Sequence, residues 1–544
     1  MPLKINPLRR YRELRRLRRI TAILAGYGLE EIVLLVRGRR FPVRKVRVDA
    51  ATRGARLRSA LEELGPTFVK LGQILSLRPD LVPPDIALEL SKLQDAAPPI
   101  PFAQIRETLE SELDRPIDAV FAEFSPEPIA AASLAQVHRA RTRTDEIVAV
   151  KVQRPGIARV IESDLDILFH LAQLMERHLS DGERYAPVDA VTEFSRSIRK
   201  ELDFVHEARN AEIFARNFAG DETIHVPRVF WDYTTPRVLT MEYIDGIKFS
   251  DLDALEQEGL DRRVLARNGA RAILKQVFDH GFFHADPHPG NLLALPGNVI
   301  APLDFGMMGR LDERLRDQVA ELLFGVVERD VDLIIRALTD MGCVQAGSDS
   351  AGLRRDLLDM LDEYYGVPLK RLDFRRLFED GLDLFHRHHL KVPAGLVLMG
   401  KALTTEEGVG RMLDPDFDMV TMAKPYVKRL FVRRYTAELK PGHWLPVLER
   451  YLRLVKELPD EIETALQKMS EYDRTDNSPR DFRIWERVAH AIAIGSIYIG
   501  SAIVLGFEVG PCVDGLSIIG LVGLGIGVLL TGWHAISNRG KYKG

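Results

Sequence analysis

Three polar residues near the middle of this 544-residue chain constrain its fold most strongly. Asn291 follows Asp286 by five positions, and Asp304 follows Asn291 by thirteen and begins the triplet Asp304-Phe305-Gly306. A short hairpin can close the second interval and bring the side chains to one site. Carboxylate and amide oxygens are the hard donors that Mg²⁺ prefers. We therefore predict that Asn291 and Asp304 hold Mg²⁺, and that Asp286 orients or deprotonates an attacking hydroxyl or water.

The same spacing occurs in the kinase catalytic loop, H-R-D-L-x-x-x-N, and in the D-F-G triplet that follows it. Upstream, residues 148–151, Val-Ala-Val-Lys, match the V-A-I-K strand, from which Lys151 would reach phosphate oxygens. Residues 239–246 resemble a kinase hinge, in which backbone groups of Glu242 and Ile244 would bind adenine and Met241 would lie behind it. These motifs predict an α+β, protein-kinase-like bilobal fold that binds ATP or ADP.

The segment that would cover the phosphates is rich in alanine rather than glycine. Alanine disfavours positive φ, so a loop of this kind should be stiffer and should hold its N–H groups farther from the phosphates. Its position ahead of Lys151 favours a phosphate loop over a short alanine-rich helix. The predicted nucleotide-contacting residues are Ala130, Ala131, Ala132, Ser133, Leu134, Ala135, Gln136, Val137 and His138.

Two parts of a conventional protein kinase are missing from the sequence. Ala285 stands where the arginine of H-R-D belongs, which argues against control by a phosphorylated activation loop. No Ala-Pro-Glu follows Asp304, and residues 307–310 lead directly into an amphipathic pattern over 311–327. The sequence therefore favours an ATPase over a protein kinase that docks peptides.

Charge is distributed unevenly along the chain. Residues 1–58 carry a net charge of +13 and the remaining residues a net charge of −17. The basic segment also contains apolar residues at helical spacing, from Leu8 to Ile20. We expect this helix to bind anionic lipid, with about 1 kcal/mol per cation. Nucleic acid and a transit peptide are the alternatives, and the scarcity of aromatic residues argues against nucleic acid.

Two stretches near the C-terminus, 489–507 and 515–533, contain no charged residue. Each is about long enough to cross a ~30 Å hydrocarbon core, and basic residues flank the pair on both sides. We expect a transmembrane hairpin with both ends in the cytoplasm. Gly523 and Gly527 form a GxxxG pattern that favours close helix packing, within one chain or between two.

Further motifs make the chain resemble the UbiB (AarF-like) family of atypical kinases. Residues 65–73 contain its KxGQ signature, and residues 201–204 with Glu207 resemble its ExD motif. The resemblance implies a helical N-terminal extension over the active site, where Lys70 and Gln73 meet Glu201 as catalytic residues. It also implies that Glu207 pairs with Lys151. Family members bind adenine nucleotides with Mg²⁺ and are associated with ubiquinone and other prenyl-lipid pathways.

We thus expect a membrane-anchored, Mg²⁺-dependent ATPase that supports ubiquinone biosynthesis at a bacterial inner membrane, with its catalytic domain facing the cytoplasm. The alternatives are a protein or small-molecule kinase and a non-catalytic, nucleotide-gated lipid-binding scaffold. Expected partners are anionic lipids and a prenyl-quinone-like lipid or ubiquinone-biosynthesis proteins, without nucleic acid, and a homodimer is left open. The predicted parts are a basic start (1–58), the KxGQ extension (59–115), small lobe (116–245), large lobe (246–470), linker (471–488) and two transmembrane helices (489–507, 515–533).

Overall fold

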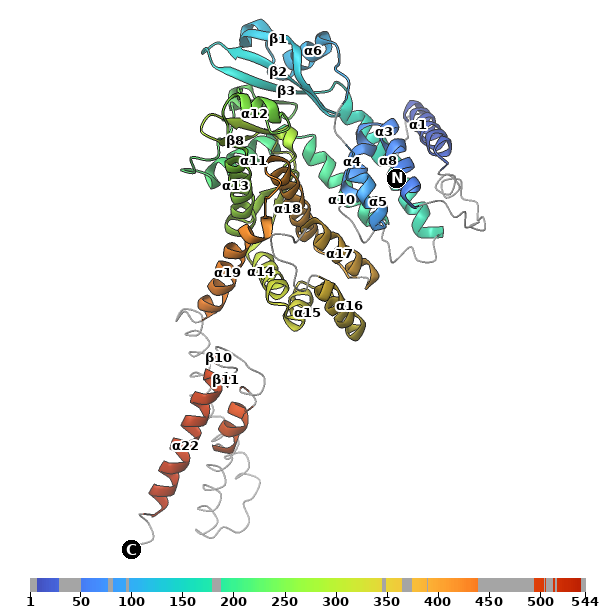
Figure 1. The fold of residues 1–544 in the computed structure, drawn as a ribbon. Helices are drawn as coiled ribbons and strands as arrows, with labels where there is room; N and C mark the ends of the chain where they lie inside the picture. Colours follow the sequence, from blue (N-terminus) through green and yellow to red (C-terminus); the bar gives the residue numbers. More distant parts are fainter. Residues whose placement is uncertain are drawn as a thin grey trace, which may run out of the picture. The chain divides into compact units, whose positions relative to one another are not determined.

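The computed structural model describes residues 7–28, 50–76, 82–93, 97–178, 187–344, 349–363, 374–388, 390–438, 494–502, 504, 512–513 and 516–539. The chain divides into two compact units, Met1–Lys428 and Arg429–Gly544. The first unit contains a small lobe built on a sheet, a helical extension and a mostly helical large lobe (Figure 1). The predicted linker, 471–488, lies outside the described residues.

The small lobe is a four-stranded antiparallel sheet in the order β1-β2-β3-β4. Side chains alternate between the faces of a strand, so Val148, Val150 and Val152 on β3 point away from Lys151. The three valines are fully buried. The strands are β1 (Phe121–Ala131), β2 (Ala135–Thr142), β3 (Ile147–Gln153) and β4 (Val238–Glu242).

Helices cover both faces of this sheet. Ile105 and Leu109 of α6 pack against the valine face, together with residues of α7. Phe204 and Ala208 of α11 pack against Leu239 and neighbouring residues on the face that carries Lys151. The helices are α6 (Phe102–Leu113), α7 (Ile117–Val120) and α11 (Phe204–Asn217), and the 3-10 turn η1 (Trp231–Tyr233) precedes β4.

The helical extension combines N-terminal helices with two helices inserted after β3. They share one apolar core, which includes Ile20, Phe68, Leu90, Ile161 and Ile198. Because α8 and α10 come from the segment between β3 and α11, the extension is joined to the small lobe at two points in the chain (Figure 1). The helices are α1 (Pro7–Gly26), α3 (Ala50–Leu64), α4 (Pro66–Leu75), α5 (Pro84–Leu90), α8 (Ile157–His178) and α10 (Pro187–Glu201).

We predicted that the apolar stripe of the basic helix α1 would face a lipid surface, but from Arg15 onward, where its side chains are described, the stripe packs against protein. Ile20 and Leu24 are 1% and 6% exposed, because this stripe packs into the core of the extension. Arg16 on the same helix donates hydrogen bonds to both carboxylate oxygens of Asp164, at 2.7 and 2.9 Å. The helix is amphipathic as expected, but its apolar side is covered by protein.

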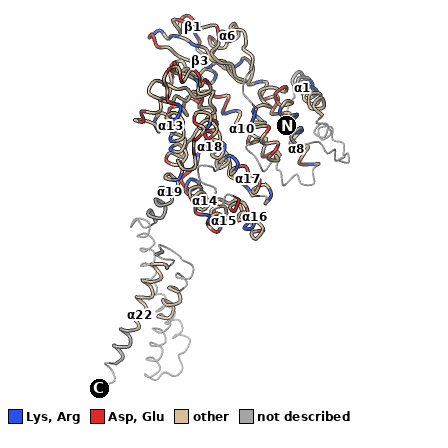
Figure 2. The backbone as a smooth tube through the Cα atoms, in the orientation of Figure 1, with Lys and Arg blue, Asp and Glu red and all other residues tan. Residues whose placement is uncertain are grey.

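The large lobe places two small sheets beside a set of helices. Aspartates begin several of these helices: Asp261, Asp312 and Asp330 accept N–H groups in the first turns of α13, α14 and α15. Acidic and basic positions are interspersed along the helices (Figure 2). The strands are β5 (Ile247–Lys248), β6 (Phe282–His284), β7 (Leu292–Leu295), β8 (Val299–Pro302) and β9 (Met308–Arg310), ordered β5-β7-β8 and β6-β9. The helices are α12 (Leu252–Gln257), α13 (Arg262–Leu274), the π-helix η2 (Lys275–His280), η3 (Pro289–Asn291), α14 (Glu313–Glu328), α15 (Val331–Asp340), α16 (Ser350–Glu363), α17 (Phe374–Arg387), α18 (Ala394–Leu413) and α19 (Met419–Glu438).

The second unit contains a helix over 494–502, a small ladder of β10 (Cys512–Val513) with β11 (Leu516–Ser517), and α22 (Ile518–Arg539). The predicted close packing is present within one chain: a Cβ on Gly523 would lie 2.2 Å from Oγ of Ser501, so a larger residue at this position would force the serine side chain to move. Within the described residues, however, no helix has the length and apolar character that a membrane crossing requires. The predicted transmembrane hairpin is therefore not supported.

Candidate active site

Lys151 and Glu207 form a largely buried ion pair. Nζ of Lys151 lies 2.8 Å from each carboxylate oxygen of Glu207, which stands in the first turn of α11. Burial acts to lower the pKa of Lys151, but the negative charges of Glu207 and Asp304 outweigh burial and raise that pKa. The ammonium is therefore a permanent cation facing Asp304. The contact implied by the resemblance is present, and its role in binding phosphate stays a prediction.

Asn291 and Asp304 meet through the predicted hairpin, which is formed by β7 and β8. Nδ2 of Asn291 lies 3.4 Å from Oδ2 of Asp304, and the Gly306 N–H donates to Oδ1 at 2.8 Å. Burial acts to raise the pKa of Asp304, but the charge of Lys151 and the Gly306 hydrogen bond hold it well below its usual range. Asp304 is therefore ionised at physiological pH.

These two residues fit a Mg²⁺ ion by the chemistry of their donors. Mg²⁺ commonly takes one or two protein oxygens and completes its shell with water and substrate phosphates. Asp304 offers an ionised carboxylate, and the amide of Asn291 carries an oxygen that rotation of the side chain would turn toward it. Asp304 and Asn291 are thus the residues that would hold the metal.

Asp286 follows β6 in the catalytic loop, and the loop backbone fixes its position. Its N–H donates to Nδ1 of His284 at 3.1 Å, and the Ala285 N–H donates to the Met307 carbonyl at 3.0 Å. Burial lowers the pKa of His284, so the imidazole is neutral and its Nδ1 can accept that hydrogen bond. The histidine thus supports the loop, and the carboxylate of Asp286 remains for other partners.

Lys401 is a site residue that the sequence analysis missed. Its Nζ lies 3.2 Å from Oδ1 of Asp286, although it belongs to α18 and stands 115 positions later in the chain. It lies outside the short motifs, so no local pattern marks it. Glu407, six positions later on α18, accepts backbone N–H groups of Phe374 and Arg375 at the start of α17.

The KxGQ extension reaches the site through Lys70. Its Nζ lies 2.9 Å from Oε2 of Glu201, and the two side chains are only 12% and 11% exposed. The pKa values of Lys151 and Asp304 respond mainly to burial and to the charges of closer partners. The positive charge of Lys70 also acts to lower both pKa values, so Lys70 lies near both residues. Gln73 differs from the expectation: its amide donates to the Leu93 carbonyl at 3.1 Å, and among the described residues it makes no hydrogen bond to Glu201.

The alanine-rich segment forms the β1–β2 turn. The Ala132 N–H donates to the Ala135 carbonyl at 2.8 Å, and Nε of Arg154 donates to the Ala132 carbonyl at 2.8 Å. No residue from 130 to 138 has positive φ, as expected for a loop built of alanine, and the stiffness of the loop stays a prediction. Leu134 is buried in the core of the extension, so the turn is anchored on that side.

Gln136 and His138 occupy places that the sequence analysis did not anticipate. Val137 pairs with Lys151 in the sheet and shares its face, whereas Gln136 and His138 point to the opposite face. Both are fully buried, with Nε2 of Gln136 3.0 Å from Nε2 of His138, and the His138 ring against Phe102. Their side chains are therefore turned away from the nucleotide face.

The hinge residues lie at the end of β4. Met241 is buried and pairs with Ala149 on the Lys151 face, as a residue behind the adenine would. The Glu242 N–H donates to the Arg228 carbonyl, at 2.8 Å. Within the described residues the N–H of Ile244 has no such partner, so it is available to a base.

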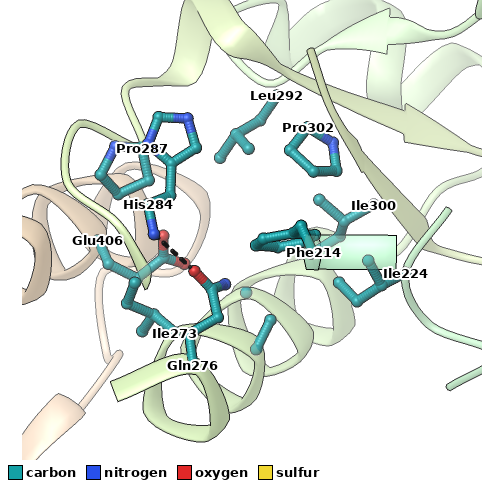
Figure 3. A pocket seen from close by; sticks show the side chains of 12 residues that line it. Phe214, Ile224, Ile273, Gln276, His284, Pro287, Leu292, Ile300, Pro302 and Glu406 are labelled. Carbon is teal, nitrogen blue, oxygen red and sulfur yellow. Dashed lines mark hydrogen bonds between the residues drawn. The ribbon is translucent and has the colours of Figure 1, made fainter. Parts of the chain in front are cut away.

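A cavity of about 30 Å³ lies under the catalytic loop, between α13 and α18 (Figure 3). Glu406 lies with Gln276 at one end, and apolar side chains such as Leu292 line the other. Oε1 of Glu406 fills the space of the missing Cβ of Gly269, at 2.3 Å from where that atom would be. In the described part of the chain its carboxyl makes no hydrogen bond, and burial raises the pKa of Glu406 to about 8.

We expect Glu406→Gln to remove a pH dependence of stability. Folded Glu406 keeps its proton up to about pH 8, whereas the unfolded carboxyl ionises near its ordinary value, so the wild type loses stability as pH rises between them. From pH 6 to 8 this loss is about 2 kcal/mol. Urea unfolding at both values should show the variant gaining by that amount relative to wild type. A constant difference between variant and wild type would contradict the buried, protonated carboxyl.

Comparisons with known proteins agree with this geometry. The ABC1 atypical kinase-like domain matches residues 92–338, and the UbiB helical domain matches residues 357–418. "Probable protein kinase UbiB" of Pseudomonas paraeruginosa is 34% identical over 96% of this chain and 96% of its own length. The chain belongs to the UbiB family. The kinase-like fold and the atypical-kinase family are therefore established for this UbiB chain.

Two further relatives of this UbiB chain are bacterial. The protein of the same name from Pseudomonas fluorescens is 36% identical over 86% of the chain and 89% of its own length. "Uncharacterized protein sll1770" of Synechocystis is 40% identical over 69% of the chain, which spans 64% of that protein. A solved complex of Rv3197 with erythromycin from Mycobacterium tuberculosis matches 66% of this chain and 92% of the Rv3197 chain, with a TM-score of 0.47 and 24% sequence identity.

Proposed function

We propose that the protein binds ATP with Mg²⁺ between its lobes and hydrolyses it. One observation carries the proposal: residues from segments far apart in the sequence meet at one site with the charges that phosphoryl transfer requires. A permanent cation faces an ionised carboxylate, and a second carboxylate lies in the adjoining loop. The residues are Lys151, Glu207, Asp286, Asn291 and Asp304.

Each side chain has a distinct part in this reaction. Lys151, held by Glu207, binds nucleotide phosphates from the sheet. Asp304 and Asn291 hold Mg²⁺, which neutralises charge on the phosphates when it is bound. Asp286 orients the attacking water and accepts its proton. Lys70, paired with Glu201, lies on the extension side of the same site.

The shortness of the segment after Asp304 supports hydrolysis over transfer to a protein. From Gly306 the chain forms β9 and begins α14 at Glu313, so these described residues leave no room for a peptide-docking platform. A protein or small-molecule kinase is the second candidate, and the relatives' name "Probable protein kinase UbiB" favours it. A non-catalytic, nucleotide-gated lipid-binding scaffold would need no intact Asp286.

The setting we propose is the cytoplasmic face of a bacterial membrane, in support of ubiquinone or another prenyl lipid. What supports it is the exposed basic side of α1, where Arg15, Arg18 and Arg19 face solvent while the apolar stripe packs inward. Guanidiniums in this arrangement can bind anionic head groups without inserting apolar side chains. The proposed ATPase site does not depend on this setting.

A single radiolabel experiment separates the candidate functions. Purified protein is incubated with γ-labelled ATP and Mg²⁺, with and without anionic vesicles that contain a prenyl quinone. Free phosphate, labelled protein and labelled lipid are measured together. We expect free phosphate alone, with more of it when vesicles are present. Label on an acceptor would favour the kinase, and no turnover with intact ATP binding would favour the scaffold.

A further inference from the structure

The catalytic loop contains no permanent cation of its own. From His284 to Asn291 its sequence holds no Lys or Arg, and Ala285 is fully buried. Nδ1 of His288 accepts the Gly290 N–H at 3.1 Å, which uses that ring nitrogen as an acceptor. The negative charge that collects on a transferred phosphoryl group must therefore be met from outside the loop.

Lys401 brings such a cation to the loop from α18. Its Nζ lies 3.2 Å from Oδ1 of Asp286, and the two side chains are 19% and 34% exposed. The neighbouring Ala402 and Leu403 are buried at 0% and 3% exposure, so the helix beneath the lysine is held by packing. Lys401 is thus a charged side chain at the open side of a fixed helix, beside the residue proposed to accept the proton.

We propose that Lys401 binds the terminal phosphoryl group of the nucleotide and holds Asp286 beside it. An ammonium has three N–H donors, and one is enough for Asp286, which leaves two for phosphate oxygens. The water oxygen forms a bond to the γ-phosphorus as the bond to the bridging oxygen breaks and its electron pair leaves with ADP. Asp286 takes the proton from the water, and Lys401 stabilises the charge on the phosphoryl oxygens.

This inference rests on the proposed nucleotide site, and its test measures nucleotide binding separately from turnover. Lys401→Met keeps the length of the side chain and removes its charge, Lys401→Arg keeps the charge, and the exposed Lys391→Met is the matched control. Calorimetry gives the affinities for ATP and ADP, each with Mg²⁺, for the full-length protein. Phosphate release gives kcat and KM for the same variants, and thermal melting reports folding.

We expect Lys401→Met to weaken ATP about 10-fold and leave ADP within twofold, because ADP lacks the phosphoryl group that Lys401 contacts. Its kcat should fall about 100-fold. Lys401→Arg should restore ATP binding, and Lys391→Met should resemble wild type. Equal losses for ATP and ADP, or no loss for either, would overturn the assignment even if the wild type hydrolyses ATP. A wild type that binds ATP without turnover would overturn the proposed function. The comparison of ATP and ADP affinities in Lys401→Met would then still decide whether Lys401 binds the terminal phosphoryl group.

Discussion

Asp304→Asn is expected to reduce ATP hydrolysis by at least about 10³-fold. The substitution keeps the shape of the side chain and an oxygen that can accept the Gly306 N–H, but it removes the negative charge. That charge is both the anionic ligand proposed for Mg²⁺ and a partner of Lys151. Phosphate release should be measured at saturating ATP over a range of Mg²⁺ concentrations.

The matched control for this experiment is Asp232→Asn, which changes an exposed aspartate of η1. We expect wild-type turnover and a wild-type melting temperature from the control. Asp304→Asn should remain folded but melt at a lower temperature, because it loses the attraction between this carboxylate and Lys151. Raising the Mg²⁺ concentration should not restore turnover in Asp304→Asn, because the variant lacks the carboxylate that would bind the metal. Wild-type turnover in the Asp304 variant would remove the basis of the site assignment.

Lys151→Met is expected to destabilise the folded protein by about 3–5 kcal/mol, because it leaves the carboxylate of Glu207 buried without its partner. The Glu207 side chain is 6% exposed. Burial already raises the pKa of Glu207, and loss of Lys151 removes the opposite charge that acts to lower it. Folding then favours the protonated acid, so the destabilisation should be smallest at acid pH and should grow as pH rises.

The double variant Lys151→Met/Glu207→Leu separates stability from function. Because it removes both charges, it should recover most of the lost free energy of unfolding, and it should remain inactive. Urea unfolding at pH 6 and pH 8, with phosphate release on the same samples, provides the measurement. Equal stability losses in the single and double variants would show that the ion pair does not govern the stability of this region.

The small-lobe and loop motifs could be predicted because each depends on short stretches of chain. In β3, alternation alone puts Lys151 opposite three buried valines, and the β7–β8 hairpin brings Asn291 to Asp304 over thirteen positions. The ion pair of Lys70 with Glu201 required the resemblance, since the two residues lie 131 positions apart.

Other features could not be predicted from the sequence, because they depend on which part of the folded chain packs against a given residue. The apolar stripe of α1 is readable from the sequence, but periodicity does not tell protein from lipid, and here Ile20 faces the core of the extension. The face of the sheet that His138 occupies follows from its register with Val150. The pKa of Glu406 is raised because the side chain is buried where α18 packs against Gly269 of α13.

The sequence by itself predicted the chemistry proposed for the site, since Asn291 and Asp304 stand at a spacing that one hairpin closes and Lys151 stands on a recognisable strand. The tertiary structure alone decided which distant charges complete that site. It brought Lys401 to Asp286 from 115 positions away. The physical reason is that hydrophobic packing positions α18 and then imposes contacts on polar side chains at its edge, and such contacts leave no pattern along the chain.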